Sequence, residues 1–458
     1  MAKPRSYFSC RECGYQSSSW LGRCPECGQW NTFDEEAVVA PSSKNRAKTT
    51  LGQTVPKLIH ELTTTDVVRL STHSAEFDRV LGGGIVPGSL LLIGGEPGIG
   101  KSTLLLQTAL ALNDRKVLYV SGEESEQQIK MRADRIAAEG GLQTRSCYVV
   151  SETATERIFE HIEAVNPDIV VIDSIQTVST ARIESSVGSI SQIRECTTEF
   201  QHFAKESGVP VLLVGHITKD GTLAGPKVME HIVDSVLQFE GDKNYGYRIL
   251  RAQKNRFGST AEIGIFEMAG NGLREVANPS QFLLSQRDET LSGAAVAATL
   301  EGARPMFVEV QSLVSSAVYG TPQRNANGFD LRRMNMLLAV LEKRCGFKLG
   351  AKDVFLNIAG GMRVNDPSID LAVACSVLSS NVDIAIPPTV CFAGELGLSG
   401  EVRPVSRLEQ RVAEADRLGF ERVFVSAYSV KQLDRARFKL DIVPVGVIEE
   451  AFRRLFVK

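Results

Sequence analysis

The stretch that decides the fold reads Gly94-Gly95-Glu96-Pro97-Gly98-Ile99-Gly100-Lys101-Ser102-Thr103. It follows an apolar run at residues 89–93 and precedes another at 104–112, so the order is strand, glycine-rich turn, helix. The stretch fits the pattern G-x-x-x-x-G-K-[ST], in which glycines let backbone N–H groups point inward around phosphates. A glycine-rich turn without a ligand is the alternative, but the flanking strand and helix are the context that the motif requires. The stretch therefore predicts a nucleoside triphosphate site.

The residues of this loop have different expected roles. Lys101 would reach the β and γ phosphates, and Ser102 would hold Mg²⁺. The N-terminus of the following helix adds partial positive charge behind the phosphates. The residues expected to contact the nucleotide are Gly95, Glu96, Pro97, Gly98, Ile99, Gly100, Lys101, Ser102 and Thr103.

The bulk properties describe an ordinary globular protein. The chain has 458 residues, enough for two or three domains, and no uninterrupted apolar run of 18 residues that would predict a membrane span. Its first residues are polar and lack the apolar segment of a signal peptide, so we expect a cytoplasmic protein without a membrane partner. The net charge is −3, so any nucleic-acid binding must come from a local patch or channel.

Four cysteines near the N-terminus have the spacing of a metal site. Two Cys-x-x-Cys pairs are each followed by glycine, and they comprise Cys10, Cys13, Cys24 and Cys27. Four thiolates favour one tetrahedral ion, and zinc is the default in a small module without other redox features. A dithiol redox pair and a disulfide scaffold are the alternatives, both disfavoured by a cytosolic setting. We expect Trp20 and Trp30 to pack on this module; exposure for contact with a partner is the alternative.

Beyond the phosphate loop, apolar strand-like runs alternate with helical stretches. Buried β-branched runs at 116–120, 146–150, 169–173 and 209–214 predict a mostly parallel α/β sheet. Asp173 ends one of these runs, where an acid that orders the Mg²⁺ shell is expected. A strand-capping aspartate without a catalytic role is the alternative.

The order of the next motifs is similar to that of RecA-type ATPases. The run 121–125 contains Glu123 and Glu124 after the next strand, and the run 215–221 begins with a glycine followed by His216. The pentapeptide Lys254-Asn255-Arg256-Phe257-Gly258 marks the bacterial RadA (Sms) family of recombination and repair ATPases, and the resemblance covers essentially the whole chain. It implies ATP as the nucleotide, Glu123 as the catalytic base with Glu124 as the fallback, and His216 as a sensor of the γ-phosphate.

The same resemblance implies that the chain works as an oligomer. Lys254 and Arg256 look like the cationic fingers that RecA-type ATPases insert into the neighbouring subunit's nucleotide site. A solvated turn is the alternative for this pair. The segment 222–228, flanked by Lys219 and Lys227, looks like a loop that faces a central channel and contacts single-stranded DNA through phosphates. An ordinary exposed loop is the alternative there.

The C-terminal part resembles the proteolytic domain of Lon. The matching segments are 302–305, 308–311, 365–371 and 392–402. Ser368 falls where the nucleophile of a Ser–Lys dyad belongs. Glu409, however, stands where the base lysine should be, so we expect an inactive fold kept for assembly or DNA contact. The helical run 330–343 and the residue after it carry four candidate DNA contacts: Arg332, Arg333, Lys343 and Arg344.

These observations predict a RecA-like α/β P-loop ATPase with two further parts. The expected boundaries are 1–33 for a zinc module, 34–70 for a polar linker, 71–278 for the ATPase and 279–458 for an inactive Lon-like α/β domain. The resemblance implies a hexameric ring that binds single-stranded and branched DNA and works with the RecA recombinase in branch migration or D-loop extension. A nucleotide-switched binding protein without translocation and an ATP-dependent peptidase are the rival functions.

Overall fold

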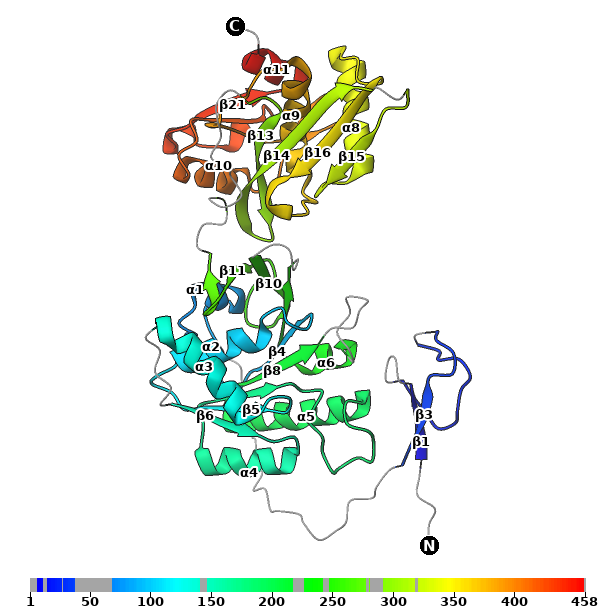
Figure 1. Ribbon diagram of the computed structural model, residues 1–458, viewed down its shortest axis with the longest axis vertical. Helices are drawn as coiled ribbons and strands as arrows, with labels where there is room; N and C mark the ends of the chain where they lie inside the picture. Colours follow the sequence, from blue (N-terminus) through cyan, green and yellow to red (C-terminus); the bar gives the residue numbers. More distant parts are fainter. Residues whose placement is uncertain are drawn as a thin grey trace, which may run out of the picture. The chain divides into compact units, whose positions relative to one another are not determined.

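The computed structural model describes residues 6–10, 15–26, 28–37, 68–140, 146–216, 226–241, 247–276, 280, 291–317 and 320–456. The chain divides into two compact units, Met1–Val276 and Ala277–Lys458 (Figure 1). The expected boundary between 278 and 279 lies two residues further along. Among the described helices, none combines the length and apolar character needed to cross a membrane.

The first unit begins with a small antiparallel sheet. Its strands are β1 (Ser6–Cys10), β2 (Gln16–Ser17) and β3 (Phe33–Ala37), in the order β2-β1-β3. Cys10, Cys24 and Phe33 are buried together at its centre. Strand β3 continues to Ala37, past the expected end of this module at residue 33. The prediction that Trp20 and Trp30 pack on the module is wrong, because both side chains are exposed.

The rest of the first unit is built around a nine-stranded sheet in the order β12-β11-β10-β9-β4-β8-β7-β5-β6. The six strands from β9 to β6 are parallel, and β10, β11 and β12 are added antiparallel at one side. The strands are β4 (Leu90–Gly95), β5 (Val117–Ser121), β6 (Cys147–Ser151), β7 (Ile169–Asp173), β8 (Val211–His216), β9 (Ser235–Glu240), β10 (Tyr247–Asn255), β11 (Ile263–Ala269) and β12 (Gly272–Glu275). The predicted mostly parallel α/β sheet is therefore confirmed.

Helices cover both faces of this sheet. They are α1 (Ala75–Leu81), α2 (Lys101–Ala111), α3 (Glu126–Gly140), α4 (Thr155–Val165), α5 (Ile190–Ser207) and α6 (Pro226–Ile232). Side chains of α1, α2 and α3 join one buried cluster, and those of α4, α5 and α6 join the other. The sheet is thus the middle layer of three.

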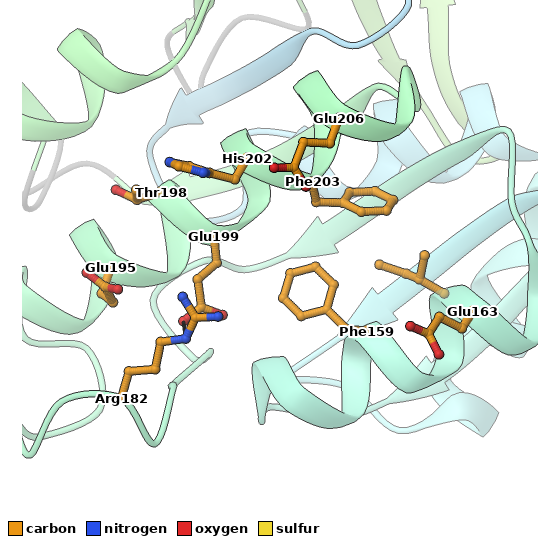
Figure 2. A pocket seen from close by; sticks show the side chains of 10 residues that line it. Phe159, Glu163, Arg182, Glu195, Thr198, Glu199, His202, Phe203 and Glu206 are labelled. Atoms are coloured by element: carbon orange, nitrogen blue, oxygen red, sulfur yellow. Dashed lines mark ion pairs between the residues drawn. The ribbon is translucent and has the colours of Figure 1, made fainter. Parts of the chain in front are cut away.

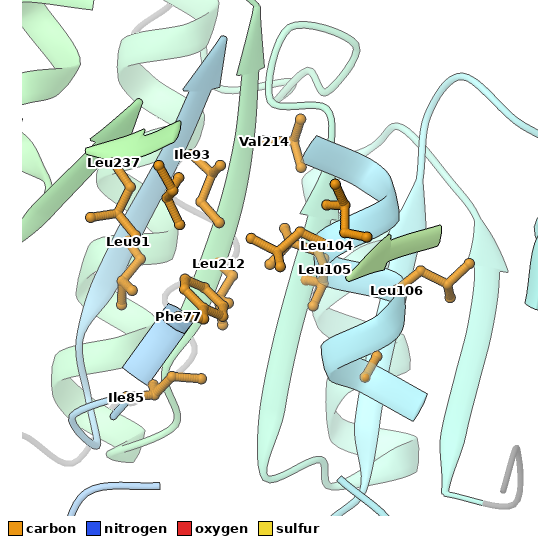
Figure 3. Close-up of a cluster of buried hydrophobic side chains, with 14 of the residues drawn as sticks. Phe77, Ile85, Leu91, Ile93, Leu104, Leu105, Leu106, Leu212, Val214 and Leu237 are labelled. Carbon is orange, nitrogen blue, oxygen red and sulfur yellow. The ribbon is translucent and has the colours of Figure 1, made fainter. Parts of the chain in front are cut away.

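Strand β4 connects the two cores because its side chains alternate between the faces. Leu91 and Ile93 pack with Leu104 and Leu105 of α2, as Figure 3 shows, while Leu90 and Leu92 belong to the opposite cluster. All four side chains are almost fully buried. This double burial fixes the strand whose carboxyl end carries the phosphate loop.

The second unit has a seven-stranded mixed sheet in the order β15-β16-β14-β13-β17-β20-β21, with a two-stranded ribbon beside it. The strands are β13 (Ala294–Glu301), β14 (Arg304–Ser316), β15 (Arg324–Asn327), β16 (Lys352–Ile358), β17 (Val390–Ala393), β18 (Glu395–Leu396), β19 (Val402–Arg403), β20 (Arg422–Ser426) and β21 (Asp441–Val445). The helices are α8 (Leu331–Cys345), α9 (Asp370–Val382), α10 (Leu408–Arg417) and α11 (Ile448–Phe456). Helix α9 is buried along most of its length and packs on β13 and β14.

Candidate nucleotide site

The phosphate loop joins the end of β4 to the start of α2. Gly98 has φ +76° and Gly100 has φ +119°, a left-handed region that glycine enters without a steric penalty. A Cβ on Gly100 would also lie 2.9 Å from Cε of Met268. The backbone conformation therefore favours glycine at both positions, and at Gly100 a larger residue would also displace the end of the Met268 side chain.

The start of α2 is suited to an anion. Gly100 is its N-cap and supplies no side-chain hydrogen bond, and the first turn contains no acidic residue. The first N–H groups of a helix have no partner within the helix, and they carry partial positive charge. The residues of this turn therefore fit a phosphate group.

Lys101 lies over the loop that it follows. Its Nζ donates hydrogen bonds to the carbonyl oxygens of Gly95 (2.8 Å) and Glu96 (3.0 Å). Burial lowers the pKa of Lys101 to about 8, although the nearby carboxylates of Asp173 and Glu123 oppose this shift. An amine held this way can pair with a phosphate that displaces it from the carbonyls.

Asp173 ends β7 and faces the same edge of the sheet. Its Oδ2 accepts a 2.5 Å hydrogen bond from Oη of Tyr119, which belongs to the neighbouring strand β5. Burial and the adjacent carboxylate raise the pKa of Tyr119 well above its ordinary value, so Tyr119 remains a donor. The phenol fixes one oxygen of Asp173, and the carboxylate lies near enough to Lys101 to act on its pKa.

Glu123 and His216 are brought together from two strands. Oε1 of Glu123 accepts hydrogen bonds from Oγ of Ser174 (2.7 Å) and lies 3.1 Å from Nε2 of His216. No described residue hydrogen-bonds to Oε2 of Glu123. Although partial burial acts to raise its pKa, the hydrogen bonds from Ser174 and His216 hold it below the ordinary value. The carboxylate is therefore ionised near neutral pH, with one oxygen positioned and its side chain 45% exposed.

Glu124 has a different environment from Glu123. Its carboxylate forms an ion pair with Arg132 of α3, and its backbone N–H donates to Oγ of Ser121. The ion pair directs Glu124 toward helix α3. Of the two adjacent glutamates, Glu123 is the one beside Lys101, Asp173 and His216.

Two residues of this site, Tyr119 and Ser174, were not predicted from the sequence. Tyr119 occupies a position that the sequence presents as one apolar residue in a buried strand. Ser174 directly follows Asp173, and its hydroxyl is buried against Glu123. A polar atom within or just after a buried run is the signal that could have identified them, because a buried hydroxyl needs a partner.

Lys254 and Arg256 lie at the opposite edge of the sheet from this site. Strand β10 runs antiparallel to β9, and its end at Asn255 pairs with Ser235, the first residue of β9. Ser235 in turn pairs with Leu91 near the start of β4, whereas the phosphate loop follows Gly95 at its end. Four residue steps along β4, from Leu91 to Gly95, separate the two edges by about 13 Å at 3.3 Å per step. The two cations therefore face away from the nucleotide site of their own chain.

Both cations have partners at this edge. Nζ of Lys254 donates to the carbonyl oxygens of Glu230 and Val233 at the end of α6. Nη1 of Arg256 lies 3.3 Å from Oδ1 of Asp234. Burial and the neighbouring Arg256 lower the pKa of Lys254.

The candidate DNA contacts are described only in part. Lys219 lies outside the described residues, and Lys227 is in α6 with a side chain outside the description. On α8, Arg332, Lys343 and Arg344 are exposed. Arg333 does not belong to an exposed basic surface, because its guanidinium pairs with the fully buried Asp370. A buried carboxylate needs a compensating cation, and Arg333 supplies it; DNA contact by this residue stays a prediction.

In the second unit, Ser368 is fully buried. Its Oγ donates to the carbonyl oxygen of Ala298 (3.1 Å) and accepts from Nη1 of Arg411 (2.7 Å). Arg411 also bonds Oδ2 of Asp366 at 2.7 Å. A guanidinium cannot serve as a base, since it is protonated at all ordinary pH values.

The prediction that Glu409 takes the place beside Ser368 is wrong. Glu409 is exposed and pairs with Arg437 at 2.6 Å. Arg407 adopts a left-handed conformation (φ +52°), and α10 begins at Leu408. In that helix Leu408, Arg411, Val412 and Ala415 share the buried face, while Glu409 lies outside it.

The N-terminal cysteines are described in part, because Cys13 and Cys27 lie outside the described residues. Cys10 and Cys24 are buried next to each other in one cluster. Their turns have the same hydrogen bond, from Cys10 N to Tyr15 O (2.9 Å) and from Cys24 N to Gln29 O (2.8 Å). Two buried cysteines, each donating its N–H to the carbonyl oxygen five residues later, fit two ligands of a tetrahedral metal site.

A separate cavity of about 650 Å³ lies between α4 and α5 (Figure 2). Phe159 and Phe203 meet there with ring centroids 5.8 Å apart, and Arg182 pairs with Glu199 at 3.3 Å. None of the predicted site residues lines this cavity. The candidate nucleotide site is therefore separate from this cavity and is formed by the phosphate loop and the carboxyl ends of the neighbouring strands.

Comparisons with known families divide the chain into three parts. Residues 8–35 match the family described as "Rubredoxin metal binding domain". Residues 56–222 match an "AAA domain", and residues 312–429 match "Subunit ChlI of Mg-chelatase". These matches agree with the predicted architecture, a RecA-like P-loop ATPase between a zinc-ribbon module and a Lon-like α/β domain.

Similar proteins match over almost the whole chain. The DNA repair protein RadA of Bacillus subtilis (strain 168) is 49% identical over 458 residues, which cover 99% of each chain. The DNA repair protein RadA of Halalkalibacterium halodurans is 50% identical over 429 residues, 93% of each chain. Among solved structures, the RadB recombinase overlaps 45% of this chain and 99% of its own with 23% identity and a TM-score of 0.37, a score that supports no argument.

Proposed function

The chain belongs to the RadA family of DNA repair proteins, and from this we propose that it is a ring-shaped, ATP-driven motor on DNA. In this proposal, identical subunits assemble head to tail and each nucleotide site is completed by its neighbour. ATP hydrolysis moves the ring along single-stranded DNA at branched recombination intermediates, in branch migration or D-loop extension. The protein would act in the cytoplasm together with the RecA recombinase.

The observation that carries the proposal is the position of Lys254 and Arg256 at the edge of the sheet away from their own phosphate loop. Cations that stabilise a transferring phosphoryl group must contact it. This pair therefore supports hydrolysis only on a nucleotide bound to another copy. A head-to-tail contact of this kind closes into a ring or continues as a filament, and the proposal is the closed ring, with six subunits.

At the nucleotide site, the side chains of this chain would bind the phosphates, hold Mg²⁺ and take a proton from the attacking water. Lys101 and the first N–H groups of α2 would bind the β and γ phosphates. Ser102 and Asp173 are the residues that would hold Mg²⁺, which when bound neutralises charge on these phosphates. Oε2 of Glu123 would accept the proton of the attacking water, while Ser174 and His216 hold Oε1. His216, linked to Glu123, would sense the γ-phosphate.

The remaining parts have proposed roles in binding. Cys10, Cys13, Cys24 and Cys27 would hold one Zn²⁺ that stabilises the N-terminal module, which is too small for a core of its own. Zinc content of the purified protein tests this: one equivalent is expected, and a Cys24→Ser variant should lose it. The Lon-like domain would serve assembly or DNA contact through Arg332, Lys343 and Arg344.

Each rival function makes a different prediction. A nucleotide-switched binding protein would bind ATP and DNA but would not unwind a fork. A peptidase would need a base beside Ser368, and the side chain found there is Arg411. We therefore keep the switch as the second candidate, since the site geometry fits hydrolysis whether or not it drives movement.

An unwinding assay on forked DNA with 5′ and 3′ single-stranded arms tests the motor. We expect ATP-dependent strand separation that requires one arm polarity and is lost in a Glu123→Gln variant that still binds ATP. Hydrolysis that DNA stimulates only weakly, without any strand unwinding, would favour the switch. No hydrolysis under any of these conditions would overturn the motor.

A further inference from the structure

A buried carboxylate pairs with Arg256 and with a second basic residue, Lys205. Asp234 connects the end of α6 to the start of β9, and its side chain is 2% exposed. Its Oδ2 accepts the N–H of Leu90 (3.0 Å) and the Nζ of Lys205 (2.7 Å). Its Oδ1 lies 3.3 Å from Nη1 of Arg256. One buried acid therefore serves two basic side chains.

The two basic side chains are held differently. Lys205 makes a short, direct ion pair through Oδ2. Arg256 makes a longer side-chain contact through Oδ1, and its side chain is 53% exposed. Its backbone is fixed more firmly, since the N–H of Arg256 donates to the carbonyl oxygen of Asp234 (3.2 Å). The guanidinium can therefore leave Asp234 while the backbone beneath it stays in place.

The residues on either side of Arg256 are tied to other parts of the domain by hydrogen bonds. Nδ2 of Asn255 donates to the carbonyl oxygens of Val80 and Leu81, and Nη2 of Arg69 donates to that of Phe257 at 2.6 Å. The Nζ of Lys205 lies 5.9 Å from the centre of the Phe257 ring. Arg256 thus projects from a turn whose neighbouring residues are hydrogen-bonded to the rest of the domain, while its own side chain is 53% exposed.

We propose that Asp234 is a positioning residue for the intersubunit reaction: it presents Arg256 to the neighbour's nucleotide, and Lys205 compensates its charge after Arg256 has moved onto the phosphate. This rests on the proposed function, because it requires Arg256 to act in trans. A buried carboxylate that lost its only cation would be strongly destabilised, and Lys205 prevents this. The second cation therefore lets the finger disengage at low cost.

The test is Asp234→Asn in the full-length protein. Asparagine can still accept the N–H of Leu90 but loses both ion pairs. We expect kcat for ATP hydrolysis to fall about tenfold or more while KM for ATP changes less than about threefold, because a misplaced catalytic group costs rate and not substrate binding. Asp168→Asn is the matched control, since Asp168 also accepts a backbone N–H but pairs weakly with Arg115 far from Arg256 in the sequence.

Mixed oligomers separate a positioning role from a merely structural one. Asp234→Asn subunits keep an intact Glu123, and Glu123→Gln subunits keep an intact finger, so mixing the two should restore hydrolysis. Mixing Asp234→Asn with Arg256→Ala should restore nothing, because both defects lie on the finger side. Should the asparagine variant fail to fold, Lys205→Ala, whose side chain is 46% exposed, should give the same pattern.

Two results would overturn the inference in distinguishable ways. If Arg256→Ala is rescued by Glu123→Gln but Asp234→Asn is not, Asp234 acts on its own chain's nucleotide site through β4, and the proposed function stands. If neither variant is rescued, the finger does not act in trans, and both proposals fail.

Discussion

Two places in this chain have the residues of an enzyme site, and they differ in what surrounds the reactive group. Glu123 is half exposed, and its Oε1 is held by two polar neighbours beside a lysine and an aspartate. Ser368 is fully buried, and its hydroxyl lies between a backbone carbonyl and a guanidinium. The first arrangement can accept a proton from a water molecule; the second has neither a base nor access. The Lon-like sequence around Ser368 therefore indicates a fold, while the side chains that contact Ser368 exclude the dyad chemistry.

Of the variants that test this comparison, the one in the phosphate loop should lose the most ATP hydrolysis. Lys101→Ala should reduce ATP hydrolysis about a thousandfold or more, since it removes the cation that contacts the transferring phosphate. Lys116→Ala, an exposed lysine before β5, should leave the rate within about twofold of the unchanged protein. Steady-state phosphate release measures both, and retained turnover in Lys101→Ala would place the active site elsewhere.

The two adjacent glutamates provide the next test. Glu123→Gln should lower kcat about 100-fold while ATP binding persists, because removing a general base costs about 10²–10⁴. Glu124→Gln should cost less than about threefold in rate, since Glu124 pairs with Arg132 and not with the catalytic residues. Nucleotide binding and single-turnover hydrolysis measure the two effects separately. A larger defect in Glu124→Gln would reverse the assignment.

In the second unit the expected effect is on stability. Arg411→Met should destabilise this unit by about 3–5 kcal/mol, because Asp366, whose side chain is only 18% exposed, would lose the cation that pairs with it. Arg437→Met removes the exposed pair with Glu409 and should cost less than about 1 kcal/mol. Denaturant unfolding of the full chain, followed by limited proteolysis, compares them. Equal stability of the two variants would mean that the Ser368 site is not held closed by Arg411.

The pH dependence of ATP hydrolysis tests the role of Lys101 at the nucleotide site. Its pKa of about 8 means that the protonated, phosphate-binding form is lost as the pH rises through this value. We expect kcat/KM for ATP to fall above about pH 8 by up to about tenfold per pH unit, because this parameter reports the free enzyme. The pKa of Glu123 is below its ordinary value, so its ionisation should limit the rate only in strong acid. A kcat/KM that stays level up to pH 10 would contradict the Lys101 assignment.

The smallest expected effect is at Ser368. Ser368→Ala removes one acceptor of Arg411 and should lower stability by about 1 kcal/mol while ATP hydrolysis stays unchanged. Neither protein should cleave casein. Casein cleavage that is lost in the alanine variant would show that the serine is a nucleophile.

The sequence predicted those site residues that are fixed by local structure. The phosphate loop and Asp173 directly follow apolar strand runs, so their position at the carboxyl edge can be deduced from the chain order alone. Tyr119 was missed because its hydroxyl bonds a residue on the adjacent strand, and strand order is not encoded locally. The opposite-edge position of Lys254 and Arg256 likewise depends on β10 being antiparallel.

The error at Glu409 has a simpler physical cause. The spacing of Leu408, Arg411, Val412 and Ala415 follows the i, i+3, i+4, i+7 pattern of one helix face, so the sequence did contain the signal that Arg411 points inward. The arginine on this apolar face is explained by its ion pair with Asp366, a residue distant in the sequence. Arg333 and Asp370 repeat this case. In both cases the arginine's position depends on an ion pair with an aspartate distant in the sequence, which the local pattern does not reveal.

The central claim is that each nucleotide site is shared between two chains, and mixing two inactive variants tests it most directly. Arg256→Ala subunits supply Glu123, and Glu123→Gln subunits supply the finger. In a ring assembled from equal amounts, about one interface in four joins an intact glutamate to an intact arginine. The account predicts that ATP hydrolysis recovers toward this fraction, well above either variant alone. Hydrolysis that stays at the level of the separate variants after confirmed co-assembly would contradict it.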